Sequence, residues 1–307
     1  MEKIKKLILA GGTGQIGKAL TNHFKNSVDE IIITTRGESR KTGNITYIHW
    51  NGISFNNTID FLEDADVLIN LVGKNVNCRY TNANKKEIFT SRTNSISALS
   101  EAIKKLKQPP KLWIQSASAT IYRHSEDKEM TEQSGEIGDG FSVDVCTTWE
   151  KTFEKETSIF NDLRKVILRT SIVLSKDEGA YPRLKTMAKF GLGGKQGNGK
   201  QMVSWIHETD LVRIIELIIK YKKLNGIFNC TAPFPIKNDL FMKELRKSLG
   251  IRFGLPAGKT LMEIGAFIIS TETELVFKSR WVIPERLNNL GFQFTYPIIK
   301  EAFDQLK

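Results

Sequence analysis

Three glycines near the N-terminus have a spacing that could hold phosphate groups. Gly11, Gly14 and Gly17 lie in the stretch GGTGQIG, after an apolar run and before a segment with helical periodicity. In such a turn the first glycine permits a sharp bend, the second lets backbone approach a pyrophosphate, and the third lets the helix pack closely on the strand. Free N–H groups around Gly14, Gln15 and Ile16 would meet the phosphates at the positive end of the helix. The spacing predicts a dinucleotide-binding turn; the alternative is a glycine-rich turn without a ligand.

The end of the next apolar run indicates which dinucleotide would bind. This run, Glu30–Thr35, is followed by Arg36, with Arg40 and Lys41 close behind. A cofactor without a 2′-phosphate usually meets Asp or Glu at this place, whereas a nearby arginine accommodates the extra phosphate. We therefore expect Arg36 to favour NADP(H) over NAD(H).

The elements that would position these residues alternate between short apolar runs and amphipathic segments. The runs that we interpret as strands cover residues 7–10, 30–35, 45–50, 66–73, 112–115, 166–169 and 227–229. Helical periodicity covers residues 16–24, 89–106, 144–157 and 211–221. This alternation predicts a Rossmann-type, doubly wound parallel sheet in an α/β fold. Ligands bind such sheets at the carboxyl ends of the strands, so the strand that ends at Gly73 should line the cofactor cleft.

The character of the chain changes after residue 174. Residues 191–199 are too rich in glycine for a regular element, which favours a functional loop. Lys195 in this loop could meet an anionic substrate, although loop lysines are more often only solvated. Prolines at 233 and 235 mark the departure to a mainly helical C-terminal lobe. We expect an NADP-binding Rossmann domain at 1–174 plus 203–231, and a smaller substrate-binding lobe at 175–202 and 232–307.

Composition narrows the classes of function. The formal net charge of +11 would suit nucleic acid, a membrane surface or small anions, but the lysines are scattered along the chain, so we keep nucleic-acid binding only as a minor alternative. Three distant cysteines without a C-x-x-C pair or clustered histidines argue against a disulfide framework or a metal site. The apolar run at 264–270 is too short to span a membrane, and no signal pattern opens the chain. We expect a cytoplasmic protein.

Several blocks along the chain carry a resemblance to one family. They are GGTGQIG (11–17), NLVG (70–73), SR (91–92), WE (149–150), LRTSIVLS (168–175), FGLGGKQGNGKQMVSWIHETDL (190–211), NCTAPFPI (229–236) and RWVIPERLNNLGFQF (280–294). In these blocks the chain resembles atypical short-chain dehydrogenase/reductases of the epimerase type. Members of this group carry a small C-terminal domain of unknown function, and some have been labelled cell-division-inhibitor-like sugar-nucleotide epimerases.

The resemblance implies a set of residues that contact NADP(H). With the glycines of the turn, they are Thr13, Gly14, Gln15, Ile16, Thr35, Arg36, Leu71, Val72, Gly73, Glu87, Arg92 and Val173. The roles of Glu87, Arg92 and Val173 depend on the resemblance alone. Without it, Glu87 and Arg92 would be interpreted as solvated charges on a helix.

The catalytic residues of the reductases that this chain resembles are only partly present. Those enzymes use a Ser/Thr and a Tyr-x-x-x-Lys set, in which the tyrosine exchanges a proton with the substrate and the lysine lowers its pKa. Ser118 fits the place of the serine. By register, Cys146 stands at the place of the tyrosine and Glu150 at that of the lysine. The usual phenolate–ammonium pair is therefore missing.

Three interpretations of this gap stay open. In the first, another side chain supplies the proton, and Tyr122, His124, His207 and Cys146 are the candidates. The alternative for Cys146 is a small buried residue, and for His207 a residue that fixes the turn at 205–210. In the second, hydride transfer persists slowly, with substrate orientation and water replacing the acid. In the third, the protein binds NADP(H) without turnover and reports the redox state to a partner.

We therefore predict an NADP(H)-dependent oxidoreductase or epimerase that acts on an unidentified small oxygenated substrate, with a nucleotide-linked sugar as one candidate. Trp205, His207 and Lys195 are expected on the substrate side of the site, with Ser118, Tyr122 and Cys146 as the catalytic candidates. The alternative is a non-catalytic NADP(H)-binding regulator. The expected partner is a small molecule, a homodimer is compatible with the sequence, and no membrane or metal is expected.

Overall fold

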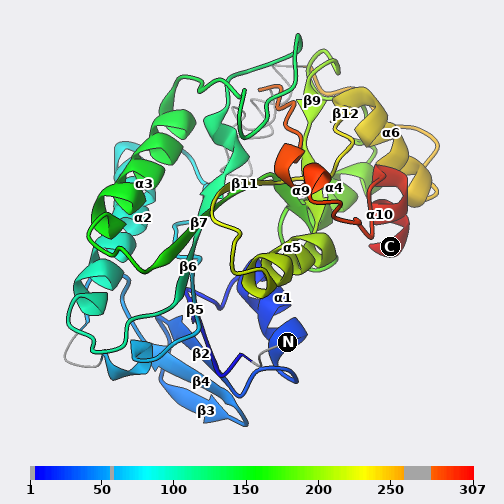
Figure 1. Ribbon diagram of the computed structural model, residues 1–307. Helices are drawn as coiled ribbons and strands as arrows, with labels where there is room; N and C mark the ends of the chain where they lie inside the picture. The colour runs from blue at the N-terminus through cyan, green and yellow to red at the C-terminus, as the bar shows by residue number, and fades with distance from the viewer. Residues whose placement is uncertain (1–3, 56–58, 259–277) are drawn as a thin grey trace.

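The structure is a computed structural model in which residues 4–55, 59–258 and 278–307 are described (Figure 1). One eight-stranded sheet runs through it in the order β11-β7-β6-β5-β1-β2-β4-β3. Every neighbouring pair is parallel except β3 and β4. The strands are β1 (Lys6–Ala10), β2 (Glu30–Thr35), β3 (Arg40–Thr42), β4 (Ile45–His49), β5 (Val67–Asn70), β6 (Leu112–Ser118), β7 (Arg164–Thr170) and β11 (Gly226–Cys230). The central strands are apolar and buried because helices cover both faces.

Two pairs of helices form the layers on either side of the sheet. Apolar side chains of α1 (Gln15–Phe24) and α5 (Glu208–Lys220) pack into the core on one face. Those of α2 (Asn82–Ile103) and α3 (Phe141–Thr157) pack into the core on the other face. Short 3₁₀ turns, η1 (Asp60–Leu62) and η2 (Ala119–Ile121), follow β4 and β6 along the chain. The predicted doubly wound Rossmann-type fold is confirmed.

A second, smaller core belongs to a mainly helical lobe. It gathers α4 (Ala180–Lys189), α6 (Asn238–Ser248) and α10 (Ile299–Gln305), and α9 (Glu285–Asn289) lies nearer the sheet (Figure 1). Two small sheets join the lobe to the rest of the chain, β8 (Ile172–Leu174) with β10 (Trp205–His207) and β9 (Met202–Val203) with β12 (Ile236–Lys237). The predicted helical lobe is present, and its exact division from the cofactor domain stays a prediction.

Some element boundaries differ from those predicted. Helix α2 begins at Asn82, seven residues before the predicted start, because its first two turns are polar and carry no apolar period. Thr81 caps this end by accepting a hydrogen bond from the Asn84 N–H at 3.2 Å. Strand β3 and helix α4 were not predicted. The apolar run at 264–270 lies outside the described residues, and no described helix is long and apolar enough to cross a membrane.

Candidate functional site

The glycine turn between β1 and α1 has the geometry that its three glycines predict. Gly11 adopts a φ of +71°, which favours glycine. A Cβ on Gly17 would stand 2.2 Å from the carbonyl oxygen of Gly12, so the helix packs too closely on the turn for any side chain. A Cβ on Gly14 would meet no atom within 4 Å. The space over Gly14 is therefore open to a ligand.

The N-terminus of α1 presents its N–H groups to this open space. Gly14 is the N-cap residue and offers no side-chain oxygen, so no side-chain cap covers the first turn. The Gly11 N–H donates to Thr34 Oγ1 at 2.9 Å, which fixes the turn to the neighbouring strand β2. Thr13 is exposed, whereas the Gln15 side chain turns toward Gly179, whose Cβ would stand 2.4 Å from Gln15 Oε1. An uncapped helix N-terminus of this kind suits an anion.

The carboxyl end of β2 offers a free cation. Arg36 is exposed and, within the described part of the chain, has no hydrogen-bond or ion-pair partner. The neighbouring Arg40 is engaged instead, with its guanidinium 3.9 Å from the centre of the Tyr47 ring. Thr35 Oγ1 accepts from the Gly37 N–H at 3.1 Å and shapes the turn after the strand. Arg36 is thus exposed at this end of the sheet, and its contact with the 2′-phosphate of NADP(H) stays a prediction.

A buried polar cluster holds the turn after β5. The Asn70 amide donates to Ser95 Oγ at 3.2 Å and to Gln115 Oε1 at 3.0 Å. Its own oxygen accepts from the Val72 N–H at 3.1 Å, and the Leu71 N–H donates to the Ala10 carbonyl at 2.8 Å. A Cβ on Gly11 would stand 2.8 Å from Val72 Cγ2. The structure therefore brings the predicted residues Leu71 and Val72 against the glycine turn.

Arg92 lies buried beside Gly73 with its charge only partly satisfied. Its side chain is 9% exposed, and Nη1 donates to the carbonyl oxygens of Ile88 at 2.9 Å and Lys74 at 3.2 Å. The guanidinium lies 4.8 Å from the centre of the Trp149 ring, and burial lowers its pKa. Within the described residues Nε has no hydrogen-bond partner, and no carboxylate pairs with this cation. A buried cation is costly without an anionic partner, which supports a ligand anion nearby.

The remaining predicted cofactor contacts lie on either side of this region. Glu87 forms an ion pair with Lys74, on the loop that follows Gly73. Val173 is half-buried and pairs in register with Ile206 in the small β8–β10 sheet. The cofactor roles of both residues stay predictions.

The positions of the missing Tyr-x-x-x-Lys pair are filled by residues that serve the interior. Cys146 is buried on α3, and burial raises the pKa of its thiol to about 12. Glu150, one turn further, forms a two-bond ion pair with Arg169 of β7, at 2.9 Å to Nε and 2.7 Å to Nη2. Both charged side chains are less than 10% exposed. The raised pKa keeps the Cys146 thiol protonated near neutral pH, and both carboxylate oxygens of Glu150 are already bonded to Arg169.

Tyr122 belongs to the same interior network. Its ring is fully buried, and its hydroxyl accepts from Arg169 Nη1 and donates to Asn229 Oδ1, both at 2.9 Å. Burial raises the pKa of this hydroxyl, although Arg169 acts in the opposite direction. The prediction that Tyr122 is a proton donor finds no support in this geometry, because both hydrogen-bonding directions of the hydroxyl are already used.

Ser118 stands where the predicted serine should be, at the carboxyl end of β6. It is half-buried and pairs in register with Thr170 of β7. Its Oγ accepts from the Thr120 N–H at 3.2 Å and donates to Thr120 Oγ1 at 3.0 Å, so that it caps η2. The hydroxyl lies at the carboxyl end of β6, which is the same edge of the parallel sheet as the glycine turn after β1. Its catalytic role stays a prediction.

The predicted substrate-side residues divide into two groups. Trp205 is fully buried in the core of the helical lobe. His207 is also buried, which lowers its pKa, and its ring bonds to the Thr209 N–H at 3.1 Å and Gln305 Oε1 at 2.9 Å. His207 therefore fixes the turn before α5, the alternative weighed from the sequence. Lys195 is exposed, in a loop that pairs with Ala257 through backbone hydrogen bonds.

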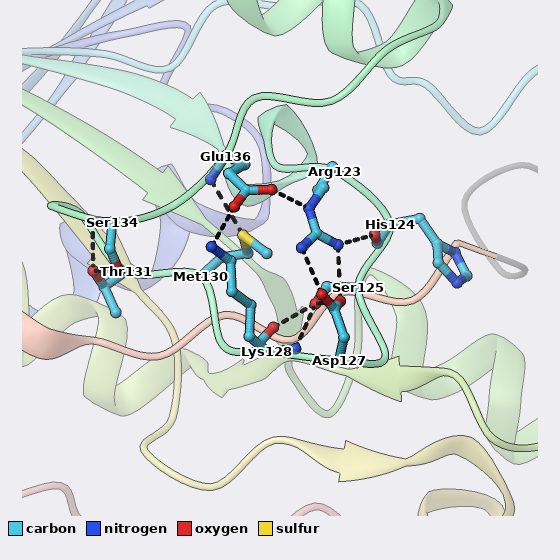
Figure 2. A network of polar contacts seen from close by, with 9 residues as sticks. All are labelled: Arg123, His124, Ser125, Asp127, Lys128, Met130, Thr131, Ser134 and Glu136. Atoms are coloured by element: carbon cyan, nitrogen blue, oxygen red, sulfur yellow. Dashed lines mark hydrogen bonds and ion pairs between the residues drawn. The ribbon is translucent and has the colours of Figure 1, made fainter.

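Residues 122–138 of the loop between η2 and α3 are held together by a network of polar side chains (Figure 2). Arg123 lies between Asp127, which it meets through two bonds of 2.9 and 2.8 Å, and Glu136. His124, a candidate proton donor, is exposed and accepts from the Ser279 N–H at 3.0 Å. This bond ties the loop to the C-terminal part of the chain.

Sequence reasoning missed the polar residues that organise the interior. Arg169 and Asn70 end the apolar runs of their strands, in VILR and VLIN, and each is bound by buried partners. A charged or amide side chain within a buried strand is itself a signal, because it needs a partner from another element. The identity of that partner, such as Glu150, could not be derived from strand periodicity.

Comparisons with known proteins agree with this geometry. The model of the NAD dependent epimerase/dehydratase family matches residues 7–231, and a domain of unknown function, DUF1731, matches residues 263–306. An epimerase family protein of Staphylococcus haemolyticus is 33% identical over 304 residues, and one of Staphylococcus aureus strain N315 is 30% identical over the same length. In both cases 99% of each chain is covered.

Solved structures give the same result. The human epimerase family protein SDR39U1, crystallised with NADPH, superposes with a TM-score of 0.85 at 27% identity and 98% coverage of both chains. A nucleoside-diphosphate sugar epimerase from Corynebacterium glutamicum superposes with a TM-score of 0.75 at 27% identity, over 97% of this chain and 57% of that one. A UDP-glucuronic acid complex of MoeE5 with NAD, at 15% identity, shares the fold.

Proposed function

Because the chain belongs to the NAD dependent epimerase/dehydratase family, in the branch with a C-terminal DUF1731 domain, we propose that it binds NADP(H) and carries out a hydride-transfer reaction on a small oxygenated substrate. The family supports the coarser statement that this is an NAD(P)-binding protein of the short-chain dehydrogenase/reductase type. The preference for NADP(H), the substrate and the reaction are our proposals.

The observation that carries the proposal is the pair formed by the uncapped N-terminus of α1 and the free Arg36. The open space over Gly14 admits a pyrophosphate to the helix N–H groups. Arg36, at the end of the adjacent strand β2, is an exposed cation that suits a 2′-phosphate. The buried charge of Arg92 adds a third group that suits an anionic ligand. A nicotinamide cofactor bound here would supply or accept a hydride.

The chain's own residues would orient both reactants. The Asn70 cluster fixes the turn at Leu71 and Val72, so hydrogen bonds within the protein hold this turn in place before any ligand binds. Ser118 presents a hydroxyl at the carboxyl edge of the sheet, where it would hold a substrate oxygen by hydrogen bonding. Lys195 is exposed and would meet an anionic group of the substrate, such as the phosphate of a nucleotide sugar.

Cofactor preference is tested by titrating NADPH and NADH, followed by the change in cofactor fluorescence. The Arg36→Asp variant should bind NADPH about ten- to a hundredfold more weakly, because it loses one charge-assisted phosphate contact and gains a repulsion. NADH affinity should change much less. The matched control is Lys151→Asp, which makes the same charge change on an exposed part of α3. An unchanged NADPH preference in Arg36→Asp would show that the 2′-phosphate is not bound there.

Turnover is tested by NADPH oxidation across a panel of carbonyl compounds and nucleotide sugars. Any activity should fall at least tenfold in Ser118→Ala while NADPH affinity stays within about twofold, because the hydroxyl is proposed to meet the substrate and not the cofactor. Equal activity in both proteins would remove Ser118 from the proposed site.

A second function is favoured by the chemistry of α3. Cys146 and Glu150 leave the usual acid–base pair absent, and the Tyr122 hydroxyl is engaged in the interior. A non-catalytic protein that binds NADP(H) and reports its redox state would need none of these groups. Tight NADPH binding together with no oxidation across the panel, and a different protease-cleavage pattern with NADPH than with NADP⁺, would support this alternative.

A further inference from the structure

The sheet ends at β11, and no strand among the described residues pairs with the outer rim of β11 (Figure 1). The register with β7 directs the backbone groups of Asn225, Ile227 and Asn229 outward, while Gly226 and Phe228 face β7. An open rim of N–H and C=O groups is a template for pairing with another chain. The structure nevertheless gives three of these outward groups side-chain partners.

Arg286 of α9 covers the carbonyl groups of the rim. Its Nη1 donates to the carbonyl oxygen of Asn225 at 2.8 Å and to that of Ile227 at 2.5 Å. The guanidinium lies 3.9 Å from the centre of the Phe228 ring, which holds it flat against the strand. A single side chain thereby occupies two acceptors that a ninth strand would use.

Glu132 of the loop 122–138 covers the next N–H group of the same rim. Its Oε1 accepts from the Asn229 N–H at 2.9 Å, and its Oε2 accepts from the Arg286 N–H at 3.4 Å. Burial raises the pKa of this carboxyl, although the backbone N–H groups act in the opposite direction. Glu132 and Arg286 are therefore joined to each other as well as to β11.

Two segments far apart in the chain deliver these side chains together. Met130 and the segment 281–283 exchange backbone hydrogen bonds, from the Met130 N–H to Trp281 at 2.7 Å and from the Ile283 N–H to Met130 at 3.0 Å. The Arg123 network braces the rest of the loop (Figure 2). The Asn229 side chain also donates to the Ile283 carbonyl at 3.1 Å. The position of Glu132 at the rim is thus set by the fold on both sides.

We propose that Glu132 and Arg286 form an edge cap, which prevents β11 from adding a strand of another molecule, and that the partner excluded is β11 of a second copy of this chain. Two β11 rims related by a two-fold axis would run antiparallel and present the same alternation of donors and acceptors, so the strand is its own complement. A surface depression of about 690 Å³, lined in part by Ile227, Phe153 and Arg286, lies beside the rim and leaves room for such an approach.

The edge cap is tested by removing its polar groups while keeping its bulk. In the Glu132→Met/Arg286→Met variant the rim loses three hydrogen bonds but keeps aliphatic chains over Phe228. Hydrogen exchange at the Asn229 amide should become at least about tenfold faster in dilute protein, as expected on loss of one charge-assisted bond. At high concentration, sedimentation velocity should show association beyond that of the wild-type chain.

The matched control is Asp144→Met/Lys151→Met, which adds the same two methionines at exposed positions on α3, away from the depression, with the same unchanged net charge. The site of association is located by Asn225→Cys in a Cys78→Ser background, where a bifunctional maleimide should cross-link dimers of the cap variant and not of the control. Unchanged exchange at Asn229, association equal to that of the control, or dimers that do not link through Asn225→Cys would overturn the proposal. If the double variant does not fold, the single variant Glu132→Met tests the proposal instead. Faster hydrogen exchange at the Asn229 amide and increased association in sedimentation velocity would support the edge cap, and wild-type values of both would overturn it.

Discussion

The glycine turn at 11–17 and the contact between α3 and β7 differ in whether their polar groups have bonding partners within the protein. At the turn, the helix N-terminus is uncapped, the space over Gly14 is open, and Arg36 has no partner among the described residues. At the α3–β7 contact, the carboxylate of Glu150 meets Arg169 within the interior. One region leaves donors and charge exposed, whereas the other satisfies them internally.

This difference indicates which of the groups expected from the resemblance, those for cofactor binding or those for proton transfer, the chain has. Polar groups left unsatisfied at a surface cleft are available to a ligand, whereas buried groups that satisfy one another hold the fold together. The proposed cofactor end of the site therefore keeps polar groups that are available to a ligand. The positions predicted for the Tyr-x-x-x-Lys pair, Cys146 and Glu150, are instead buried in the protein interior.

The largest expected effect would come from restoring the lysine of the missing pair. Glu150→Lys places a second buried cation beside Arg169 and should lower the free energy of unfolding by about 3–5 kcal/mol, because it breaks a buried ion pair and leaves a charge uncompensated. Urea denaturation at neutral pH measures the change. Glu154→Lys, an exposed position on the same helix, should cost less than about 0.5 kcal/mol. A small loss in Glu150→Lys would show that the pair is not structural.

Two alanine substitutions in the glycine turn should separate packing from ligand binding. Gly17→Ala should lower the free energy of unfolding by about 2–3 kcal/mol, because its Cβ would overlap the Gly12 carbonyl. Gly14→Ala meets open space, so its unfolding free energy should stay within about 0.5 kcal/mol of the wild-type value. NADPH should nevertheless bind at least about tenfold more weakly to Gly14→Ala. Wild-type NADPH affinity in this variant would place the pyrophosphate elsewhere.

The smallest expected effect concerns the Cys146 thiol at alkaline pH. Its folded-state pKa is raised to about 12, so its contribution to stability is fully present below the ordinary thiol pKa. Above that value the unfolded chain ionises and the folded one does not. Stability should therefore fall toward pH 12, by up to about 1.4 kcal/mol per pH unit for one thiol. Unfolding free energies measured between pH 8 and pH 10 (on the order of 1 kcal/mol of change) test this.

The control for this prediction is the half-buried Cys78. Cys146→Ala should reduce the alkaline fall in stability, and the buried Cys230, whose thiol pKa is also raised by burial, should contribute to the remainder. Iodoacetamide should modify Cys78 in the folded protein and reach Cys146 only after unfolding, as read by mass spectrometry. Rapid modification of Cys146 in the folded chain would show an accessible thiolate and return it to the list of catalytic candidates.

The sequence by itself determined the features that depend on near neighbours. Strand β2 matches its predicted bounds, Glu30–Thr35, because an unbroken apolar and β-branched run is buried wherever it lies in a parallel sheet. The glycine turn was predictable for a similar reason, since a bend, a close approach and a helix start are all encoded within seven residues. The absence of a Tyr-x-x-x-Lys pair on α3 also follows directly from the residues present, which include lysines but no tyrosine.

Only the tertiary structure decided which polar side chains face a ligand and which face each other. Tyr122 meets Asn229 across 107 residues, and Glu132 meets Arg286 across 154, so no local pattern encodes either contact. Trp205 and His207 were expected on the substrate side of the site, yet both are buried. The burial of a side chain depends on elements from distant parts of the chain that pack against it. Its protonation and hydrogen bonding depend in turn on that burial.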